Sequence, residues 1–415
     1  MARTRLADRV TVWQTPQGLK VYFDQIKQLP MLDIVIAFNA GSSRDGKNFG
    51  LANFTSSMIN EGAGNLNADA IAAQFANLGV IFTSSTNRDM TSLSLRSLTK
   101  AEVLQPALKL FTTLLSKPTF PQKAFARTQR ILADAIQAKL QSPGTIATDN
   151  FFKLIYQNYP YAHPVIGTTD SIAKITAQQL KAFHQRYYVA KNATLAIVGD
   201  ITREQAQAIA AQISKALPSG AAAAPLAAPK SAAKKSLNIK YPSTQTAIRI
   251  GQIGVTRSNP NYVALVVANY ILGGDSSSRL FHVVREKNGL SYGVGSALVP
   301  YAQNGPFLIY LQTKDKQTPK AIKVTQSVVE KFVKNGITQK ELTLAKDYLT
   351  GNLPLQLASN SQIANYLALV GRYNLPVNYL PDLIDKIKTI SVEDVNQALK
   401  QSIFPKKMVI VTVGK

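Results

Sequence analysis

The chain has 415 residues, no cysteine and a formal net charge of +24, and 46% of its residues are hydrophobic. This length exceeds what one core usually serves, so we expect two domains. The lack of cysteine excludes disulfides, thiol catalysis and cysteine-held metals, and no apolar run is long enough to predict a membrane span. The basic residues are scattered rather than interleaved with aromatic residues, so we interpret the charge as solvated surface and expect no nucleic-acid partner.

The first half of the chain alternates strand-like and helix-like patterns. Strands are predicted at 10–14, 19–25, 33–38, 80–85, 91–98 and 193–198, and helices at 50–59, 68–78, 101–115, 121–140, 145–157, 176–187 and 203–216. The composition then shifts to Ala, Pro, Lys and Ser over 218–236, which is typical of a linker. We therefore predict a first domain at 1–217 and a second domain at 237–415.

The second half repeats this organisation. Strands are predicted at 246–253 and 307–313, and helices at 261–272, 319–334, 339–349 and 362–371. A single offset of 215 residues places Ile175 on Ile390 and Ala193 on Met408, across a capped helix, a loop and a buried strand. One offset over three elements indicates duplication. We expect two homologous α+β domains, each a mostly antiparallel sheet with helices packed on one face.

The stretch 276–292 lies between two of these elements and carries a cation and a phenol. Ser277 or Ser278 is expected to cap a helix and Gly289 to end it, and Tyr292 is expected to open the next strand. Arg285 precedes Tyr292 by seven residues across the turn, so both side chains are able to reach one site. The alternative is that Arg285 pairs with an acid and Tyr292 belongs to the core.

The segment Gly50-Leu51-Ala52-Asn53-Phe54-Thr55-Ser56-Ser57-Met58 resembles the zinc motif of the M16 peptidases, the pitrilysin-like inverted zincins. That family has His-x-x-Glu-His on this helix, within the context Gly-Leu-Ala-His-Phe-Leu-Glu-His-Met. Here Asn53 and Ser57 stand at the two histidine positions and Ser56 at the glutamate position. The family's third ligand, a glutamate in a later helix, falls near Asp134.

The chemistry of these substitutes decides what the resemblance implies. An amide and two hydroxyls are poor ligands for Zn²⁺, and Ser56 is no general base. We therefore expect no metal and no cofactor in this chain, and no hydrolysis by the chain alone. The resemblance covers nearly the whole chain, through 161–167, 197–201 and 273–292, and it implies the M16/LuxS-like metallohydrolase fold.

The resemblance also gives Arg285 and Tyr292 a role. In this family such a pair binds the substrate backbone and stabilises the carbonyl oxyanion across from the zinc. A chain that keeps Arg285 and Tyr292 but lacks the zinc motif looks like the non-catalytic subunit of a heterodimeric peptidase. The implied partner is a homologous M16 subunit with an intact His-x-x-Glu-His motif that carries the zinc, and the implied substrates are unfolded peptides.

Other roles stay open beside this one. The alternatives are a structural or scaffolding homologue and a peptide-binding homodimer without peptidase activity. The stretch Gly273-Gly274-Asp275 is too short for the glycine-rich loop of the mitochondrial presequence-processing subunit, so a bacterial heterodimer is favoured. We expect a periplasmic location, with a signal peptide removed, and the alternative is a cytoplasmic location.

Overall fold

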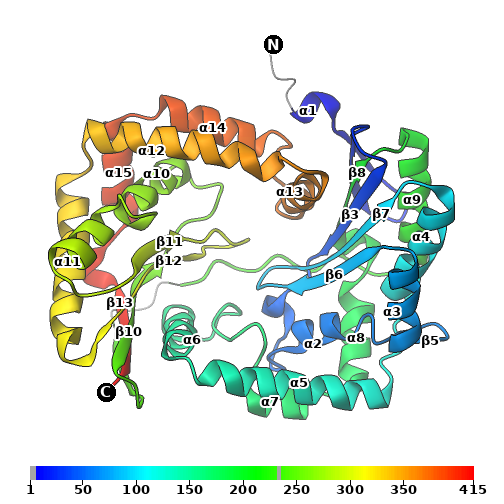
Figure 1. The fold of residues 1–415 in the computed structure, drawn as a ribbon, viewed down its shortest axis with the longest axis horizontal. Helices are drawn as coiled ribbons and strands as arrows, with labels where there is room; N and C mark the ends of the chain where they lie inside the picture. Colours follow the sequence, from blue (N-terminus) through cyan, green and yellow to red (C-terminus); the bar gives the residue numbers. More distant parts are fainter. Residues whose placement is uncertain (1–5, 231–234) are drawn as a thin grey trace. The chain divides into compact units, whose positions relative to one another are not determined.

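The computed structural model describes residues 6–230 and 235–415, so residues 231–234 of the predicted linker and the first five residues of the chain lie outside the described residues. The chain divides into two compact units (Figure 1). The first comprises Met1–Ile136, Pro164–Pro225 and Pro354–Pro381, and the second comprises Gln137–His163, Leu226–Leu353 and Asp382–Lys415. Each unit is built around one sheet, but neither is continuous in sequence.

The first unit holds a six-stranded sheet with the order β1-β2-β8-β3-β7-β6. Its strands are β1 (Thr11–Gln14), β2 (Lys20–Gln25), β3 (Met31–Phe38), β6 (Ile81–Thr86), β7 (Thr91–Leu98) and β8 (Ala193–Gly199), and a separate ribbon pairs β4 (Gly62–Ala63) with β5 (Leu66–Asn67). Within this sheet β2 and β8 run parallel, and the other neighbours are antiparallel. Strand β8 and nearly all of β3 are buried, as expected of strands that are mostly apolar and covered on both faces.

The second unit holds a five-stranded sheet with the order β11-β12-β10-β13-β9. Its strands are β9 (Ser236–Lys240), β10 (Gln245–Ile253), β11 (Val294–Leu298), β12 (Pro306–Lys314) and β13 (Val409–Gly414). From β9 to β11 this sheet matches the run β2-β8-β3-β7-β6, and its parallel pair, β13 with β9, takes the place of β8 with β2. The equivalent topologies confirm the predicted α+β fold with two homologous halves.

The helices surround these sheets. The first unit contains α1 (Leu6–Arg9), α2 (Leu51–Ser57), α3 (Ala68–Asn77), α4 (Ala101–Ser116), α7 (Thr169–Lys174), α8 (Ala177–Tyr187), α9 (Arg203–Ala216) and α13 (Asn360–Arg372). The second contains α6 (Pro143–Tyr156), α10 (Tyr262–Gly273), the π-helix η3 (Phe281–Lys287), α11 (Thr318–Asn335), α12 (Gln339–Asn352) and α15 (Val392–Ser402). The chain passes from one unit to the other within α5 (Gln122–Leu140) and α14 (Tyr379–Thr389). Short 3₁₀ turns are η1 (Ser42–Arg44), η2 (Ala190–Asn192), η4 (Asp315–Gln317), η5 (Leu353–Leu357) and η6 (Pro405–Lys407).

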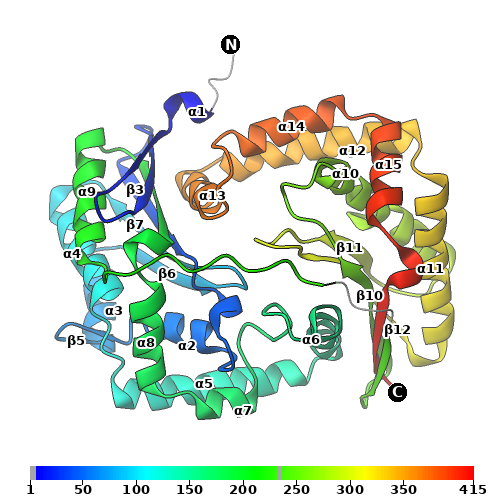
Figure 2. The same ribbon diagram turned by 180° about the vertical axis from the view of Figure 1, so that it is seen from behind.

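One helix in each unit comes from the other half of the sequence. Helix α13 covers the face of the first sheet opposite α4 and α9, and α6 covers the face of the second sheet opposite α11 (Figures 1 and 2). The approach of α13 is close, because a Cβ atom on Gly371 would lie 2.3 Å from Thr194 Cγ2. Helix α6 precedes the predicted linker but packs on the second sheet, and α13 follows the linker but packs on the first sheet. The compact units therefore differ from the expected segments 1–217 and 237–415.

Helix α6 is held on the second sheet by apolar and polar contacts. The Phe151 ring is completely buried, and a Cβ atom on Gly251 of β10 would lie 2.9 Å from its Cζ. Arg249 of β10 donates from Nε to Thr148 Oγ1 and from Nη2 to the Gly144 carbonyl, each at 2.9 Å. Packing and hydrogen bonding together fix this helix on its sheet.

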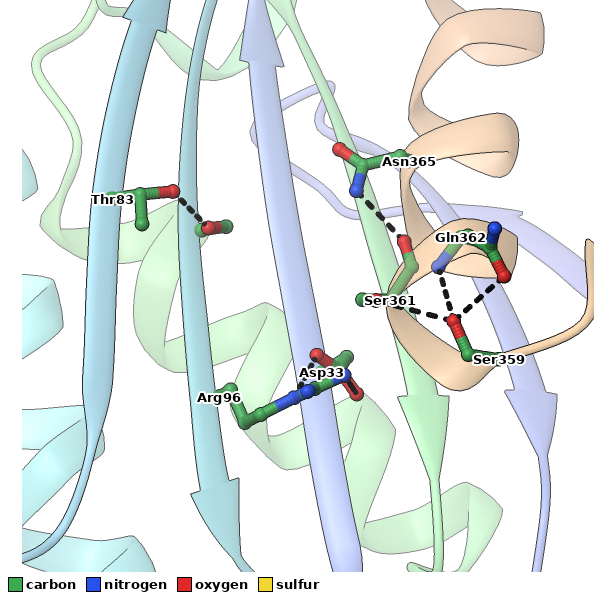
Figure 3. Close-up of polar contacts among 8 residues, drawn as sticks. Asp33, Thr83, Arg96, Ser359, Ser361, Gln362 and Asn365 are labelled. Atoms are coloured by element: carbon green, nitrogen blue, oxygen red, sulfur yellow. Dashed lines mark hydrogen bonds and ion pairs between the residues drawn. The ribbon is translucent and has the colours of Figure 1, made fainter. Parts of the chain in front are cut away.

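The face of the first sheet that carries α13 is polar on the strands nearest the β6 edge. Arg96 of β7 forms a bidentate pair with Asp33 of β3, at 2.9 and 3.1 Å. Thr83 of β6 and Ser94 of β7 bring their hydroxyl oxygens to 2.6 Å (Figure 3). At the start of α13, Ser359 Oγ accepts from the Gln362 N–H at 3.3 Å. This part of the face is thus hydrogen-bonded rather than apolar.

The predicted linker has no helix or strand over 218–230, yet hydrogen bonds hold this segment at two points. The Ala223 N–H donates to Asn192 Oδ1 at 2.9 Å in the first unit. In the second unit, Gln303 Nε2 donates to the Leu226 carbonyl at 2.8 Å. Across the described ranges, no helix combines the length and the apolar character that a membrane crossing needs.

His184 makes the stability of the first unit depend on pH. The imidazole is 3% exposed, and its Nε2 lies 2.8 Å from the Leu115 carbonyl oxygen. Burial lowers the pKa of His184 from 6.5 to about 4, and the hydrogen bond to Leu115 opposes this shift only in part. As the pH falls below 6.5 the unfolded chain binds the proton first, so stability is complete above that pH and is lost toward pH 4.

We expect the free energy of unfolding to fall by roughly 2–3 kcal/mol between pH 7 and pH 4.5 through this residue. The measurement is denaturant unfolding at both pH values, for the native chain and for His184→Gln, which keeps a donor but does not titrate in this range. The variant should lose that part of the pH dependence. Equal pH dependence in both proteins would show that His184 is not the group responsible.

Candidate functional site

The chain between α10 and β11 is shaped by Asp275 and by the π-helix η3. The Asp275 carboxylate accepts from the Ser277 N–H at 2.8 Å, from the Ser277 hydroxyl at 2.7 Å and from the Tyr270 hydroxyl. Ser278 donates its own hydroxyl to the Asp275 carbonyl at 2.6 Å. The prediction that Ser277 or Ser278 caps the helix through its side chain is therefore wrong, since a neighbouring carboxylate supplies the acceptor for this turn.

The π-helix ends at Lys287, and Gly289 supplies the left-handed residue that the sequence predicts at its end. This glycine has φ +60°, and its N–H donates to the Arg285 carbonyl at 2.9 Å. The following Leu290 N–H donates to the Val284 carbonyl at 3.0 Å. These are helix-terminating bonds that need a left-handed residue. Wide π-helical turns are rare and often occur at functional sites, and this one contains Arg285.

Arg285 and Tyr292 come together at this site. The guanidinium carbon of Arg285 lies 4.7 Å from the centre of the Tyr292 ring and 4.5 Å from that of Phe281. Two rings therefore hold the cation by cation–π contact. Tyr292 is 87% exposed, and no acid pairs with Arg285 anywhere in the described ranges. The alternative of an ion-paired Arg285 and a core Tyr292 does not fit this geometry.

Tyr292 does not occupy the position expected for it within the strand. Strand β11 begins at Val294, and Tyr292 precedes it in a loop. The even spacing of Tyr292 and Val294 suggested one shared face, but Val294 is buried and Tyr292 is exposed. The loop turns the phenol outward, which leaves its hydroxyl open to a ligand.

A pocket of about 710 Å³ adjoins this pair and lies wholly within the second unit. Its walls come from the loop after α10, from Phe281 and Tyr292, and from the side chains of β10 and β12. The lining residues are Gln245, Arg249, Gly273, Gly274, Asp275, Ser276, Phe281, Tyr292, Gly293, Val294, Tyr310, Leu311 and Gln312. Sequence reasoning identified Tyr292 but missed the contributions of Arg249, Tyr310 and Gln312, because register across a sheet has no local sequence signal.

Arg279 anchors the segment that precedes η3. Its Nη2 donates to Glu341 at 2.7 Å and to the Gly336 carbonyl at 2.9 Å. Burial acts to raise the pKa of Glu341, but the hydrogen bonds from Arg279 and Thr338 and the charge of Arg279 together hold this pKa below its usual value. The Arg279 guanidinium also lies 4.8 Å from the Phe332 ring centre. These contacts tie the segment before Arg285 to α11 and α12.

The helix at the degenerate zinc motif forms as predicted, but shorter, as α2. Gly50 precedes it with φ +93°, a conformation that favours glycine. The buried Asp45 carboxylate accepts from the Gly50 N–H at 2.7 Å and from the Ala52 N–H at 2.8 Å. An acid at a helix N-terminus also complements the helix dipole. The scaffold of the motif is thus intact even though its ligand residues are replaced.

The residues at the zinc positions do not fit a zinc ion. Ser57 donates its hydroxyl to the Asn53 carbonyl at 2.9 Å, and Ser56 is only 3% exposed. Asp134 lies exposed on α5, and it makes no hydrogen bond or ion pair with Asn53, Ser56 or Ser57. No group of three or more acids or histidines able to hold a metal occurs in the part of the chain that the structure describes.

Comparison with known proteins places the chain in a family. Residues 25–169 match a family model described as "Insulinase (Peptidase family M16)", and residues 174–349 match one described as "Peptidase M16 inactive domain". A crystal structure from Pseudomonas fluorescens, described as a peptidase M16 inactive domain, is 42% identical, with a TM-score of 0.94 and 98% of each chain covered. The chain belongs to peptidase family M16. The resemblance drawn from Asn53, Ser56, Ser57 and the segment around Arg285 is confirmed at the level of the family.

More distant relatives carry differing descriptions. A Helicobacter pylori protein named "Non-peptidase homolog YmxG" is 27% identical over 92% of this chain and 88% of its own length. A Bacillus subtilis protein named "Uncharacterized zinc protease YmxG" is 25% identical over 92% of this chain and 93% of its own. The structure of a Helicobacter pylori protease, at 20% identity and a TM-score of 0.89, shares the fold. This M16 chain itself lacks the ligand residues of the family's zinc motif.

Proposed function

We propose that this chain is the non-catalytic subunit of a heterodimeric M16 peptidase, in which it supplies Arg285 and Tyr292 to bind the peptide substrate. The observation that carries the proposal is the pairing of a cation and an exposed phenol at 4.7 Å, beside a pocket, in a chain whose zinc positions hold an amide and hydroxyls. The partner would be a homologous M16 subunit with an intact His-x-x-Glu-His motif, and it would hold the metal.

The geometry of the pair suits recognition of a peptide carbonyl. The rings of Phe281 and Tyr292 contact the guanidinium, so its N–H groups remain available at the edges. The Tyr292 hydroxyl adds a neutral donor. Donors that are fixed before reaction stabilise the negative charge that develops on a carbonyl oxygen during hydrolysis. Arg285 and Tyr292 would therefore bind and orient the substrate, while water activation belongs to the partner.

Mixing the purified subunits tests this proposal. Alone, the chain is expected to contain no stoichiometric zinc by plasma mass spectrometry and to cleave no unstructured peptide. Addition of the zinc-bearing homologue from the same genome should give a complex by size-exclusion chromatography, with cleavage at least roughly 10²-fold above either subunit alone. The periplasmic location is part of the same proposal and is checked by cell fractionation.

Two results would favour the other roles. A stable complex without any gain in cleavage indicates a scaffolding homologue. Self-association of this chain with peptide binding, and no association with the zinc-bearing homologue, indicates a peptide-binding homodimer. Zinc-dependent cleavage by the isolated chain would contradict all three roles.

A further inference from the structure

The floor of the pocket beside Tyr292 is formed by polar side chains on one face of the second sheet. In the register of β10 and β12, Arg249 lies opposite Tyr310, and Gln245 lies opposite Lys314. Residues opposite each other in an antiparallel pair point to the same side, and so do residues two apart along a strand. Arg249, Tyr310, Gln312 and Gln245 therefore share the face that also carries α6, and all four line the pocket.

Arg249 brings a positive charge to this floor without an anionic partner. Its hydrogen bonds go to the neutral oxygens of Thr148, Gly144 and Ile248, at 2.9 Å each. No carboxylate pairs with Arg249 within residues 6–230 and 235–415. A guanidinium has five N–H donors, so two remain for a ligand. Burial lowers the pKa of Arg249 from its ordinary value, which shows that the surroundings disfavour the cation, and a bound anion would offset that cost.

A second donor lies next to Arg249. A Cβ atom on Gly144 would lie 3.2 Å from Arg249 Nη2 and 3.4 Å from Gln312 Nε2, so both nitrogens converge on the first turn of α6. The N-terminal end of a helix carries a partial positive charge. The side chain of Gln312 makes no hydrogen bond within the described ranges, so its amide is available to a ligand.

One acid also lines the pocket. The Asp275 carboxylate accepts from the Tyr270 hydroxyl and from two donors of Ser277, so its oxygens are engaged within the loop after α10. Two further cations lie near these residues: Lys314 is on the same face of β12 as Gln312, and Arg285 contacts the Tyr292 ring. Donors and positive charge therefore dominate the part of the pocket around Arg249.

We propose that the pocket is a carboxylate-binding subsite in which Arg249 and Gln312 hold one carboxylate group of a bound peptide. The group is either an acidic side chain or the C-terminal carboxylate of the peptide. Carboxylate binding by this subsite needs only this chain. The further step, in which the subsite selects the peptides that Arg285 and Tyr292 bind, rests on the proposed function.

Fluorescence anisotropy of labelled unstructured peptides with the full chain, without any partner subunit, tests the subsite. One set replaces each Glu in turn by Gln, and another compares a free C-terminus with its amide. We expect one carboxylate to tighten binding about tenfold, as hydrogen bonds to a charged group do. Sensitivity to Glu identifies a side chain as the ligand, and sensitivity to the amide identifies the C-terminus.

Gln312→Glu is the decisive variant. Gln312 is exposed, so the change should not disturb folding, yet it puts a negative charge beside Arg249. The tenfold preference should then disappear. The matched control is Gln339→Glu, the same charge change at an exposed position of α12 outside the pocket, which should keep the preference.

Several results would overturn the subsite. These are equal binding of all peptides, no saturable binding up to about 1 mM, or a preference that survives Gln312→Glu. Because the assay uses this chain alone, a subsite that binds as expected stands even when the mixed subunits cleave nothing. Conversely, if the mixed subunits show cleavage that depends on Arg285 but the carboxylate preference is absent, the proposed function is retained and only the subsite is refuted.

Discussion

Arg285→Ala and Tyr292→Phe are each expected to reduce kcat/KM of the assembled M16 peptidase by about 10²–10³-fold, the usual loss when one preorganised oxyanion donor is removed. Tyr292→Phe keeps the ring that contacts Arg285 at 4.7 Å and removes the hydroxyl alone, so its effect reports on the donor. Arg285→Ala removes the cation, the only charged donor of the pair. The measurement is steady-state cleavage of an unstructured peptide by each complex.

Lys287→Ala is the matched control for the arginine. Lys287 lies exposed on the same π-helix, so its replacement removes the same charge without touching the pair. It should leave kcat/KM within about twofold, because exposed charges without a specific partner contribute little. Size-exclusion chromatography of all three variants shows that the complex still assembles. Wild-type turnover by both Arg285→Ala and Tyr292→Phe would exclude the pair from the reaction.

The sequence predicted the parts of the site that depend on local chemistry. Gly289 ends the helix because a left-handed residue is needed there, and that need is visible from one glycine between a helical and an extended pattern. The loop position of Tyr292 was not visible, because the spacing to Val294 fits a strand equally well. The side chains of Arg249 and Gln312 were missed because they meet through strand register and through α6, which lies about a hundred residues earlier in the chain.

The duplication was visible in the sequence, because it preserves one pattern of elements at a constant offset. The exchange of α6 and α13 between the two halves was not visible, since the packing of a helix on a distant sheet leaves no periodic signal. Helices at 145–157 and 362–371 were both predicted, close to α6 and α13. Amphipathicity shows that a helix has a buried face but not which sheet covers it. One signal did exist: 193–198 reads as a buried strand, and a strand whose residues are almost all apolar needs cover on both faces.

The exchange of α6 and α13 leads to the second large effect. A substitution in either helix should destabilise the unit whose sheet the helix contacts, and not the unit formed by its neighbours in the sequence. Phe151 precedes the linker but is buried against the second sheet, so Phe151→Ala should destabilise the second unit by about 3–5 kcal/mol, as large cavities in cores do. Gly371 follows the linker but packs on the first sheet. Gly371→Val should destabilise the first unit by about 1–3 kcal/mol through overpacking against Thr194 and Tyr22.

Native-state hydrogen exchange locates each loss. Phe151→Ala should weaken amide protection in β10 and β13 and leave β3 and β8 as in the native chain, and Gly371→Val should do the reverse. Gly351→Ala is the control, since a Cβ atom there meets nothing within 4 Å and alanine suits a helical position in the last turn of α12. If Phe151→Ala instead weakened β3 and β8, the boundary at residue 217 would describe the cooperative units, and α6 would belong with the strands that surround it in the sequence. Protection that follows the sheet contacted by each helix would show that packing, rather than chain order, defines the two units.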